Sequence, residues 1–363
     1  MKKYLILAAT AALVLGACAK VETIAPKAEP QVIGFSNYAP KALNKAAAAN
    51  YVEANALVAD ADFDVWAWKT PYNTSFTGSN GSAFFSSWYT VTYKNGGDTS
   101  GDANAYPDGY RYWPSGDTPD WLSFAAYYPS NGAGITAPAA GLGAYTFEAQ
   151  ATAAAQVDFM VSDVVKDQTY DNTNTTTKGT VNLTFRHQLT KVQVKFKTTQ
   201  QVVDDEKTEV KITDAKFKSI KNTGTLTTAF DGSATTSTWS GQDGAVAYPI
   251  KFPTDALTAT ASTVANEDIF LMVPQTMLEK ANAAAQYIEI SWDVITDGVT
   301  TSNTKKLYLD DCKDADNGDT LANIDWNKNN FVTYVITVGP QPILFTATAE
   351  EWDHEQIGYY NVQ

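Results

Sequence analysis

The sequence has few of the side chains on which most active sites are built. Its 363 residues include only two histidines, His187 and His354, and two cysteines, Cys18 and Cys312. No Gly-x-Ser-x-Gly, phosphate-binding loop, dinucleotide fingerprint or His-Glu-x-x-His motif occurs. His187 ends a strand-like pattern, so we expect it to pack rather than to act as a base, and no matched nucleophile accompanies His354. We therefore predict that the protein is not an enzyme and needs no cofactor. The enzymatic alternative is a secreted hydrolase, which the missing base and nucleophile disfavour.

An acidic stretch, Asp310–Asp319, offers carboxylates of the kind that bind calcium. An EF-hand loop requires glycine at its sixth position and glutamate at its twelfth. Counted from Asp314, those positions hold Asp319 and Asp325. We therefore expect a solvated acidic loop here and no metal site.

Basic residues are also scarce. The chain has 26 Lys and Arg against 40 Asp and Glu, a formal net charge of −14, and its only arginines are Arg111 and Arg186. Without the first 17 residues, which hold two lysines and no acidic residue, the balance is 24 − 40 = −16. Duplex nucleic acid is bound through Lys and Arg, so nucleic acid is not an expected partner.

No apolar run reaches the roughly 18 residues of a membrane-spanning helix. The most notable apolar run is Leu5–Leu15, near the start of the sequence. This run is too short to span a bilayer but suits the apolar region of an export signal, and two lysines precede it. It ends in Leu-Gly-Ala before Cys18, the pattern of a bacterial lipobox. We predict a signal peptide at residues 1–17 and lipidation of Cys18, the alternative being an ordinary signal peptide that contains a cysteine. Cys312 then stands alone, and a buried apolar role is expected for it.

Aromatic residues are plentiful, with nine Trp, nineteen Tyr and sixteen Phe, and together with abundant Thr, Ser and Gly they favour β-structure. In residues 62–68 two sets of side chains alternate, namely Phe63, Val65 and Ala67 against Asp62, Asp64, Trp66 and Trp68. The apolar run Ile269–Pro274 is typical of a central strand that ends at proline. Short strands separated by turn-rich loops indicate a β-sandwich.

A polar stretch at residues 166–178 is the best candidate for a domain boundary, because it lacks large aliphatic side chains. The alternative is a long hairpin loop within one domain. We predict a lipidated leader with a short apolar strand at residues 18–50, an N-terminal sandwich at 51–175 and a C-terminal sandwich at 176–363.

Several short segments, in their order along the chain, resemble the fimbrillin family of Bacteroidales, the subunits of lipoprotein-derived (type V) pili. The resemblance rests on the lipobox, on the short strand before a lysine-bearing loop, and on six further segments. These are Tyr112–Pro114, Leu122–Pro129, Val157–Met160, Val181–Val192, Leu271–Gln275 and Trp326–Gly339. The resemblance implies an all-β fold of two tandem transthyretin-like Greek-key β-sandwich domains.

The resemblance also implies proteolytic processing. A trypsin-like protease cuts the loop after the first strand and releases that strand, which contains Val32, Ile33 and Phe35. The cut would follow Lys45 or Lys41. Family members often carry arginine at this point, so this chain requires a protease that accepts lysine.

The groove left by the first strand is then filled by C-terminal strands of a neighbouring pilin subunit, which gives a homo-polymer. Carried onto this sequence, the donor residues are Ile343, Phe345, Ala347, Ile357 and Tyr359. The resemblance implies a lipidated precursor in the outer membrane, then an extracellular fimbrium that supports adhesion.

An alternative function from a different class is a monomeric surface lipoprotein that binds glycans. Exposed aromatic side chains stack on sugars, and Trp66, Trp68 and Tyr89 are the candidates. This alternative requires those rings to be open to solvent.

Overall fold

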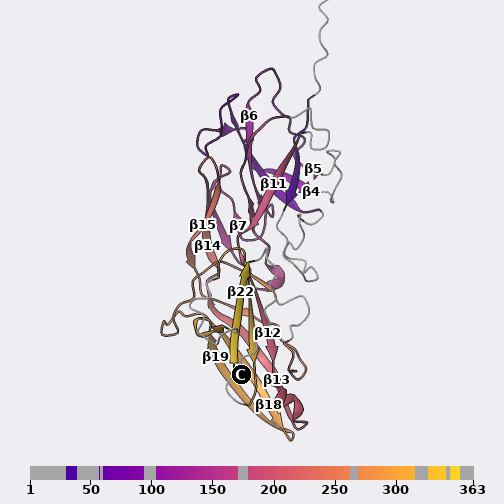
Figure 1. Cartoon of the computed structure of the whole chain (residues 1–363), viewed down its shortest axis with the longest axis vertical. Helices are drawn as coiled ribbons and strands as arrows, with labels where there is room; N and C mark the ends of the chain where they lie inside the picture. Colours follow the sequence, from indigo (N-terminus) through magenta and orange to yellow (C-terminus); the bar gives the residue numbers. More distant parts are fainter. Residues whose placement is uncertain are drawn as a thin grey trace, which may run out of the picture. The chain divides into compact units, whose positions relative to one another are not determined.

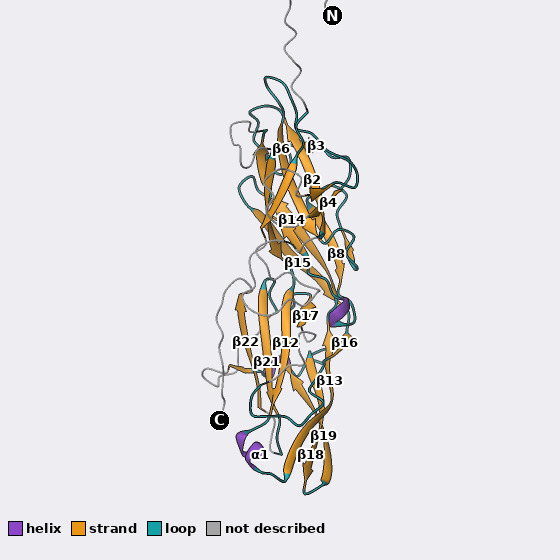
Figure 2. Cartoon of the chain, turned by 90° about the vertical axis from the view of Figure 1, so that its right-hand side faces the viewer, coloured by secondary structure: helices purple, strands orange, loops and turns teal. Residues whose placement is uncertain are grey.

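The computed structural model describes residues 30–38, 57, 60–93, 104–170, 179–261, 269–314, 326–340 and 344–351. They are nearly all β-strand and loop, which confirms the predicted all-β class (Figures 1 and 2). The helices within these ranges are α1 (Gln200–Asp204) and two 3-10 turns, and none of them is long and apolar enough to cross a membrane. Residues Gln31–Gln363 form one compact unit.

The largest sheet has nine strands, and the first strand of the chain lies at one end of its hydrogen-bonded path. The path runs β1-β11-β9-β6-β2-β4-β5, with β10 beside β6 and β3 beside β2. The strands are β1 (Gly34–Tyr38), β2 (Asp62–Thr70), β3 (Ser82–Ala83), β4 (Tyr89–Tyr93), β5 (Asn104–Ala105), β6 (Trp121–Tyr128), β9 (Met160–Ser162), β10 (Val165–Gln168) and β11 (Thr180–His187).

Three smaller sheets complete the fold. One follows the order β15-β14-β8-β7, one β17-β12-β21-β22-β20, and one β16-β13-β18-β19. Their strands are β7 (Ile135–Thr136), β8 (Gly143–Glu148), β12 (Thr190–Lys197), β13 (Thr208–Ile220), β14 (Thr223–Phe230), β15 (Thr235–Asp243), β16 (Val246–Pro249), β17 (Ile269–Met272), β18 (Tyr287–Thr296), β19 (Val299–Tyr308), β20 (Lys313–Asp314), β21 (Asn330–Thr337) and β22 (Leu344–Glu351). The last two of these sheets share one apolar core, as expected for a sandwich.

Strand β2 is buried on both faces, so the aromatic residues named for the glycan-binding alternative were wrong. Phe63 and Val65 face the core of the nine-stranded sheet, whereas Trp66 and Trp68 pack into a second cluster with Phe76, Ala125 and Phe230. Trp66 is only 4% exposed, Trp68 7% and Tyr89 2%, so these rings cannot stack on a sugar in the folded chain. The alternation of residues 62–68 is real, but an alternating aromatic face can be covered by a second layer as well as by water.

Strand β17 is the terminal strand of its sheet and not the central strand that we expected. Its apolar run has a different cause, because its two faces line two cores. Phe270 and Met272 lie in the core of the C-terminal sandwich, and Ile269 and Leu271 lie in a separate cluster. We call this cluster the middle core, and it consists of Tyr127, Tyr145, Phe147, Ala149, Phe159, Val161, Leu189, Leu226, Ile269, Leu271 and Val273.

The predicted division after residue 175 does not match the pairing of the strands. Residues 171–178 lie outside the described residues, but strands that follow them pair with strands that precede them. β11 pairs with β1 and β9, and β14 pairs with β8. The composition of a loop does not say which distant strands pair with each other. A polar stretch of this kind can therefore connect two strands of the same sheet.

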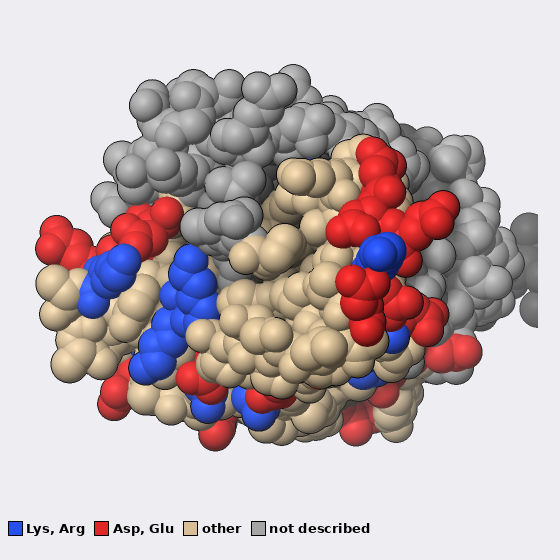
Figure 3. All heavy atoms as spheres, turned by 90° about the horizontal axis from the view of Figure 1, so that it is seen from below, with Lys and Arg blue, Asp and Glu red and all other residues tan. Residues whose placement is uncertain are grey.

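The charged surface mixes both signs, and Figure 3 shows Lys and Arg beside Asp and Glu on one face. Three ion pairs illustrate this: Lys207–Asp297 at 3.4 Å, Lys211–Glu209 at 2.7 Å and Lys280–Asp311 at 2.6 Å. Every partner exposes more than a third of its side chain. Such pairs contribute only about 0–1 kcal/mol each, so the fold depends on its apolar cores.

We expect Leu271→Ala to lower the free energy of unfolding by about 2–5 kcal/mol, because it removes a fully buried side chain from the middle core. Val299→Ala is the matched control, since Val299 is 68% exposed and its truncation should change stability by less than about 0.5 kcal/mol. Urea denaturation followed by tryptophan fluorescence measures both. Equal effects of the two substitutions would contradict the assignment of the middle core.

Candidate functional site

The N-terminal segment, residues 31–38, is added to the nine-stranded sheet from a distant part of the sequence. β1 pairs in parallel with β11, in a register that runs from Gly34 opposite Thr180 to Tyr38 opposite Thr184. β1 is the outermost strand of the path, and among the described strands it pairs with β11 alone. The strand predicted at Val32–Phe35 is thus present, but it starts two residues later and extends to Tyr38.

The first half of the segment is held by a different partner. Val32 forms an antiparallel bridge with Tyr112. The Ile33 N–H donates to the Arg111 carbonyl at 2.8 Å, and the Trp113 N–H donates to the Gln31 carbonyl at 2.9 Å. The first half of the segment therefore forms backbone hydrogen bonds with residues 111–113, and its second half pairs with β11.

Two side chains of the segment are buried in the core of the nine-stranded sheet. Ile33 is 1% exposed and Phe35 is 3% exposed. The Phe35 ring meets the Phe63 and Phe124 rings edge-on, with centroids 6.5 and 5.7 Å apart. Full burial of such side chains stabilises by about 1.5–3 kcal/mol each, so the pair contributes about 3–6 kcal/mol. That is a large share of the 5–15 kcal/mol typical of a whole domain.

Polar contacts fix the register of the segment on its groove. The Tyr170 hydroxyl donates to Oε1 of Gln31 at 2.9 Å, and the Tyr106 hydroxyl donates to the Ile33 carbonyl at 3.2 Å. The Ser36 hydroxyl donates to Oδ1 of Asn182, its neighbour on β11. A shift of the segment by one residue would break these contacts and turn its apolar side chains out of the core.

Aromatic side chains surround the Arg111 end of the groove. Arg111 lies over the Tyr89 ring, 4.6 Å from its centroid, and the Tyr89 and Tyr106 rings are stacked. Burial raises the pKa of Tyr89 to about 12, although Arg111 acts in the opposite direction. Tyr110 and Tyr112 are the exposed members of the group, at 55% and 45%. This end of the groove is therefore lined by aromatic rings, some buried and some exposed.

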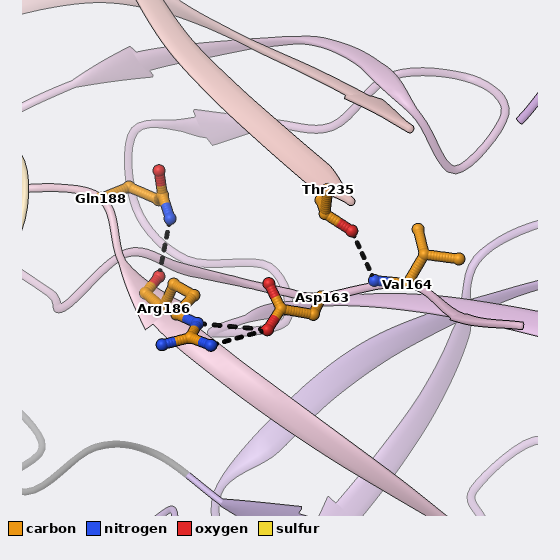
Figure 4. A network of polar contacts seen from close by, with 5 residues as sticks. All are labelled: Asp163, Val164, Arg186, Gln188 and Thr235. Atoms are coloured by element: carbon orange, nitrogen blue, oxygen red, sulfur yellow. Dashed lines mark hydrogen bonds and ion pairs between the residues drawn. The ribbon is translucent and has the colours of Figure 1, made fainter. Parts of the chain in front are cut away.

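β11, which forms the wall of the groove, is anchored at its far end. His187 and Asp158 form a fully buried pair, with Nδ1 of the imidazole 3.0 Å from the carboxylate. Next to it, the Arg186 guanidinium donates twice to Oδ2 of Asp163, at 3.2 and 2.9 Å (Figure 4). In the same network the Gln188 amide donates to the Arg186 carbonyl at 2.8 Å. These contacts tie the end of β11 to residues on both sides of β9, and none of them involves β1.

A further bond in this network reaches a second sheet. The Val164 N–H donates to the Thr235 hydroxyl at 2.7 Å, which joins the connection after β9 to the start of β15 (Figure 4). The anchoring of β11 is therefore continuous with the sheet that packs on the nine-stranded sheet.

Some of the predicted site residues lie outside the described residues: Cys18, Lys41, Lys45, Ile343, Ile357 and Tyr359. Phe345 lies in β22, and Ala347 in the same strand is 1% exposed in the core of the C-terminal sandwich. β22 pairs with β21 over eight residues and with β20 over two, so in this monomer it belongs to its own sheet.

Other predicted features are resolved by the described part of the chain. Cys312 is fully buried in the C-terminal core, as expected of a packing residue. His187 is buried against Asp158, as expected of a packing residue. Within the described residues no group of three His, Cys, Asp or Glu side chains is arranged to hold a metal. Of the acidic stretch, Asp310 and Asp311 accept bonds from Lys280, and residues from 315 onward lie outside the described part.

Sequence reasoning missed the other side of the groove. Tyr106, Tyr112, Trp113, Tyr170 and Gly179 all contact the N-terminal segment, yet none stands near it in the sequence. The Tyr-Trp-Pro motif at 112–114 drew attention only as part of a resemblance. No local pattern links these residues to the first strand.

A comparison with protein families decides the identity of the chain. A family model described as fimbrillin-like matches residues 49–352, well over half of the sequence. The chain belongs to the fimbrillin-like family. This confirms the resemblance drawn from the sequence, and membership supports a fimbrial role at the cell surface.

One solved structure shares the fold of this chain at a TM-score above 0.5. A fimbrial protein from Bacteroides vulgatus is 18% identical, with a TM-score of 0.55, and the match covers 89% of this chain and 99% of that one. The tip fimbrial protein Mfa3 from Porphyromonas gingivalis is 10% identical, with a TM-score of 0.40 and coverage of 81% and 95%. No curated protein matches the chain.

We expect Phe35→Ala to destabilise the intact chain by about 3–5 kcal/mol, because it empties a pocket between Phe63 and Phe124. Tyr110→Ala, which truncates a ring that is 55% exposed, is the control and should have a small effect. Thermal unfolding of both variants measures the difference. A Phe35→Ala variant as stable as the control would show that the segment does not complete the core.

The buried tyrosines predict loss of stability at high pH. Burial raises the pKa of Tyr89 and of Tyr128 to about 12, whereas an unfolded tyrosine titrates near 10. The folded state therefore holds protons that the unfolded state loses, so the contribution of these tyrosines to stability should be constant below about pH 10 and fall between pH 10 and 12. Denaturation midpoints across this range test the expectation. Tyr89→Phe should reduce the slope, and an unchanged slope would exclude Tyr89 as a source.

Proposed function

We propose that this chain is a structural pilin that polymerises by strand exchange after proteolysis removes its N-terminal strand. The observation that carries the proposal is the position of that strand. Ile33 and Phe35 belong to the core, yet β1 is the outermost strand of its sheet and precedes Lys41 and Lys45 in the sequence. A single cut after either lysine separates the strand covalently from the sheet that it completes.

The energetics support replacement of the strand rather than simple loss. Without residues 31–38 the core loses about 3–6 kcal/mol of apolar burial, and β11 is left with an unpaired edge. An exposed sheet edge beside an open apolar pocket binds another strand readily. The anchoring of β11 by Asp163 and Asp158 supports a groove that keeps its shape while it is empty.

The donor on this proposal is the C-terminal segment of a neighbouring subunit, with Ile343, Phe345 and Ala347 on its inserting face and Ile357 and Tyr359 after them. β22 supports this role, because one of its edges is covered by only two residues of β20. To act as donor it must leave β21, with which it pairs over eight residues. Strand addition elsewhere would then replace the backbone bonds that it gives up.

The lipid anchor fits the same sequence of events. Cys18 precedes Val32, so a cut after Lys41 or Lys45 leaves the lipidated cysteine and the first strand on one fragment. A trypsin-like protease would thus release the subunit from the outer membrane and open its groove in one step. The precursor stays monomeric, because its groove is filled in cis, and the cut subunit joins the extracellular fimbrium.

Limited trypsin digestion of the purified precursor tests the proposal. We expect cleavage after Lys45 or Lys41, loss of residues 31–38 and a ladder of SDS-resistant oligomers on an unboiled gel. N-terminal sequencing of the ladder identifies the bond that was cut.

The matched control is the double variant Lys41→Gln, Lys45→Gln, which should stay monomeric under the same digestion. A wild-type chain that is cut at these lysines, loses its first strand and still yields no oligomers would sink the proposal.

A further inference from the structure

Two segments at opposite ends of the chain share one sequence pattern. Pro30–Ser36 reads PQVIGFS and Pro340–Thr346 reads PQPILFT, at an offset of 310 residues. Proline, glutamine, isoleucine and phenylalanine recur in register, and the seventh position carries a hydroxyl in both. We propose that Pro340–Thr346 of a second copy of this chain occupies the site of Pro30–Ser36, residue for residue at this offset. The inference rests on the proposed function and specifies its partner segment and register.

The recurring side chains are the ones that the groove recognises. The side-chain amide oxygen of Gln31 accepts a hydrogen bond from the Tyr170 hydroxyl, and Gln341 has the same amide. Ser36 donates to Asn182, and Thr346 has a hydroxyl at the matching position.

The two apolar positions follow the same rule. Ile33 and Phe35 fill the core pockets, which Ile343 and Phe345 match in size and shape. In this register the side chains of Gln31, Ile33, Phe35 and Ser36 therefore each have a counterpart in the donor.

Proline at position 342 fits the site of Val32. The two hydrogen bonds that flank the Val32–Tyr112 bridge use the N–H of Ile33 and the carbonyl of Gln31. Among the described backbone bonds of the segment, none uses the N–H of Val32. A proline there loses no bond, because the N–H that it lacks is not needed. At position 33 the same proline would remove the N–H that donates to the Arg111 carbonyl.

Leucine at position 344 meets the one tight point of the groove. A Cβ at Gly34 would lie 3.2 Å from the Thr180 hydroxyl and 3.6 Å from the Gly179 carbonyl. Gly34 is not among the residues with positive φ, so its backbone conformation is open to leucine. The closest atom is the end of a side chain, which can turn away by the few tenths of an ångström that are required. The Cβ of the donor residue thus requires only a small adjustment of Thr180.

The first experiment transplants the donor sequence into the intact precursor. The triple variant Val32→Pro, Gly34→Leu, Ser36→Thr changes the native segment to PQPILFT. We expect its Tm to fall by no more than about 4 °C. Ile33→Pro is the matched control, because it removes the N–H that bonds to Arg111, and it should lower Tm by at least about 6 °C. A triple variant as unstable as Ile33→Pro would overturn the inference, whether or not the chain polymerises.

The second experiment reads the register in the polymer. Ser36 faces Asn182 in the intact chain, so Asn182→Cys with Thr346→Cys should cross-link neighbouring subunits after trypsin treatment and oxidation. Cys312 is buried, and Cys18 leaves with the cut fragment, so neither competes. Boiled, non-reducing gels should show covalent oligomers.

The control pairs Asn182→Cys with Leu344→Cys or Thr348→Cys, which test shifts of two residues in either direction. Oligomers cross-linked only by a shifted pair would overturn the register while leaving strand exchange intact. Wild-type chains that fail to polymerise at all after the cut would overturn both.

Discussion

The rest of the structure depends on whether the outer edge of β11 is covered. The N–H and carbonyl groups of residues 180–184 need a partner strand, and the core beside them needs two apolar side chains. Ile33 and Phe35 supply the two side chains, and β1 supplies the partner strand. β1 is itself at the end of the hydrogen-bonded path of the sheet. Most soluble proteins protect such edges because they invite association. In this fimbrillin-like chain the protection is the segment that, on the proposed route, one proteolytic cut removes.

The remaining structure keeps the groove in a defined shape. The first half of the segment binds residues 111–113 and the second half binds β11. The end of β11 is in turn held by ion pairs of its Arg186 and His187 with Asp163 and Asp158. Those anchors do not involve β1. On the proposed route they hold the groove after β1 has left. A groove that stays ordered does not have to be rebuilt by the incoming strand, so less of the binding free energy goes into ordering.

Local patterns predicted the parts of the fold that depend on one segment at a time. The alternation of residues 62–68, the burial of Cys312 and the apolar first strand all follow from composition and period. What covers each face does not follow, which is why Trp66 and Trp68 were mistaken for surface rings and β17 for a central strand. Pairing between segments about 146 residues apart, such as Gly34 with Thr180, leaves no mark in either segment alone. The groove of the candidate site therefore emerged only from the structure, and the match between Pro30–Ser36 and Pro340–Thr346 gains meaning only once the contacts of the first segment are known.

The two segments also differ in a way that suits their separate tasks. The native segment is part of the same chain as its groove, so its effective concentration is of the order of millimolar and it needs no special affinity. Once cut, it loses that advantage and competes as a separate fragment. The proposed donor has the tighter fit at Leu344, yet it continues into β22, whose further residues would extend the pairing along β11 on the proposed route. Exchange is therefore driven less by better side chains than by the change from one chain to two, which is what makes proteolysis the controlling step on the proposed route.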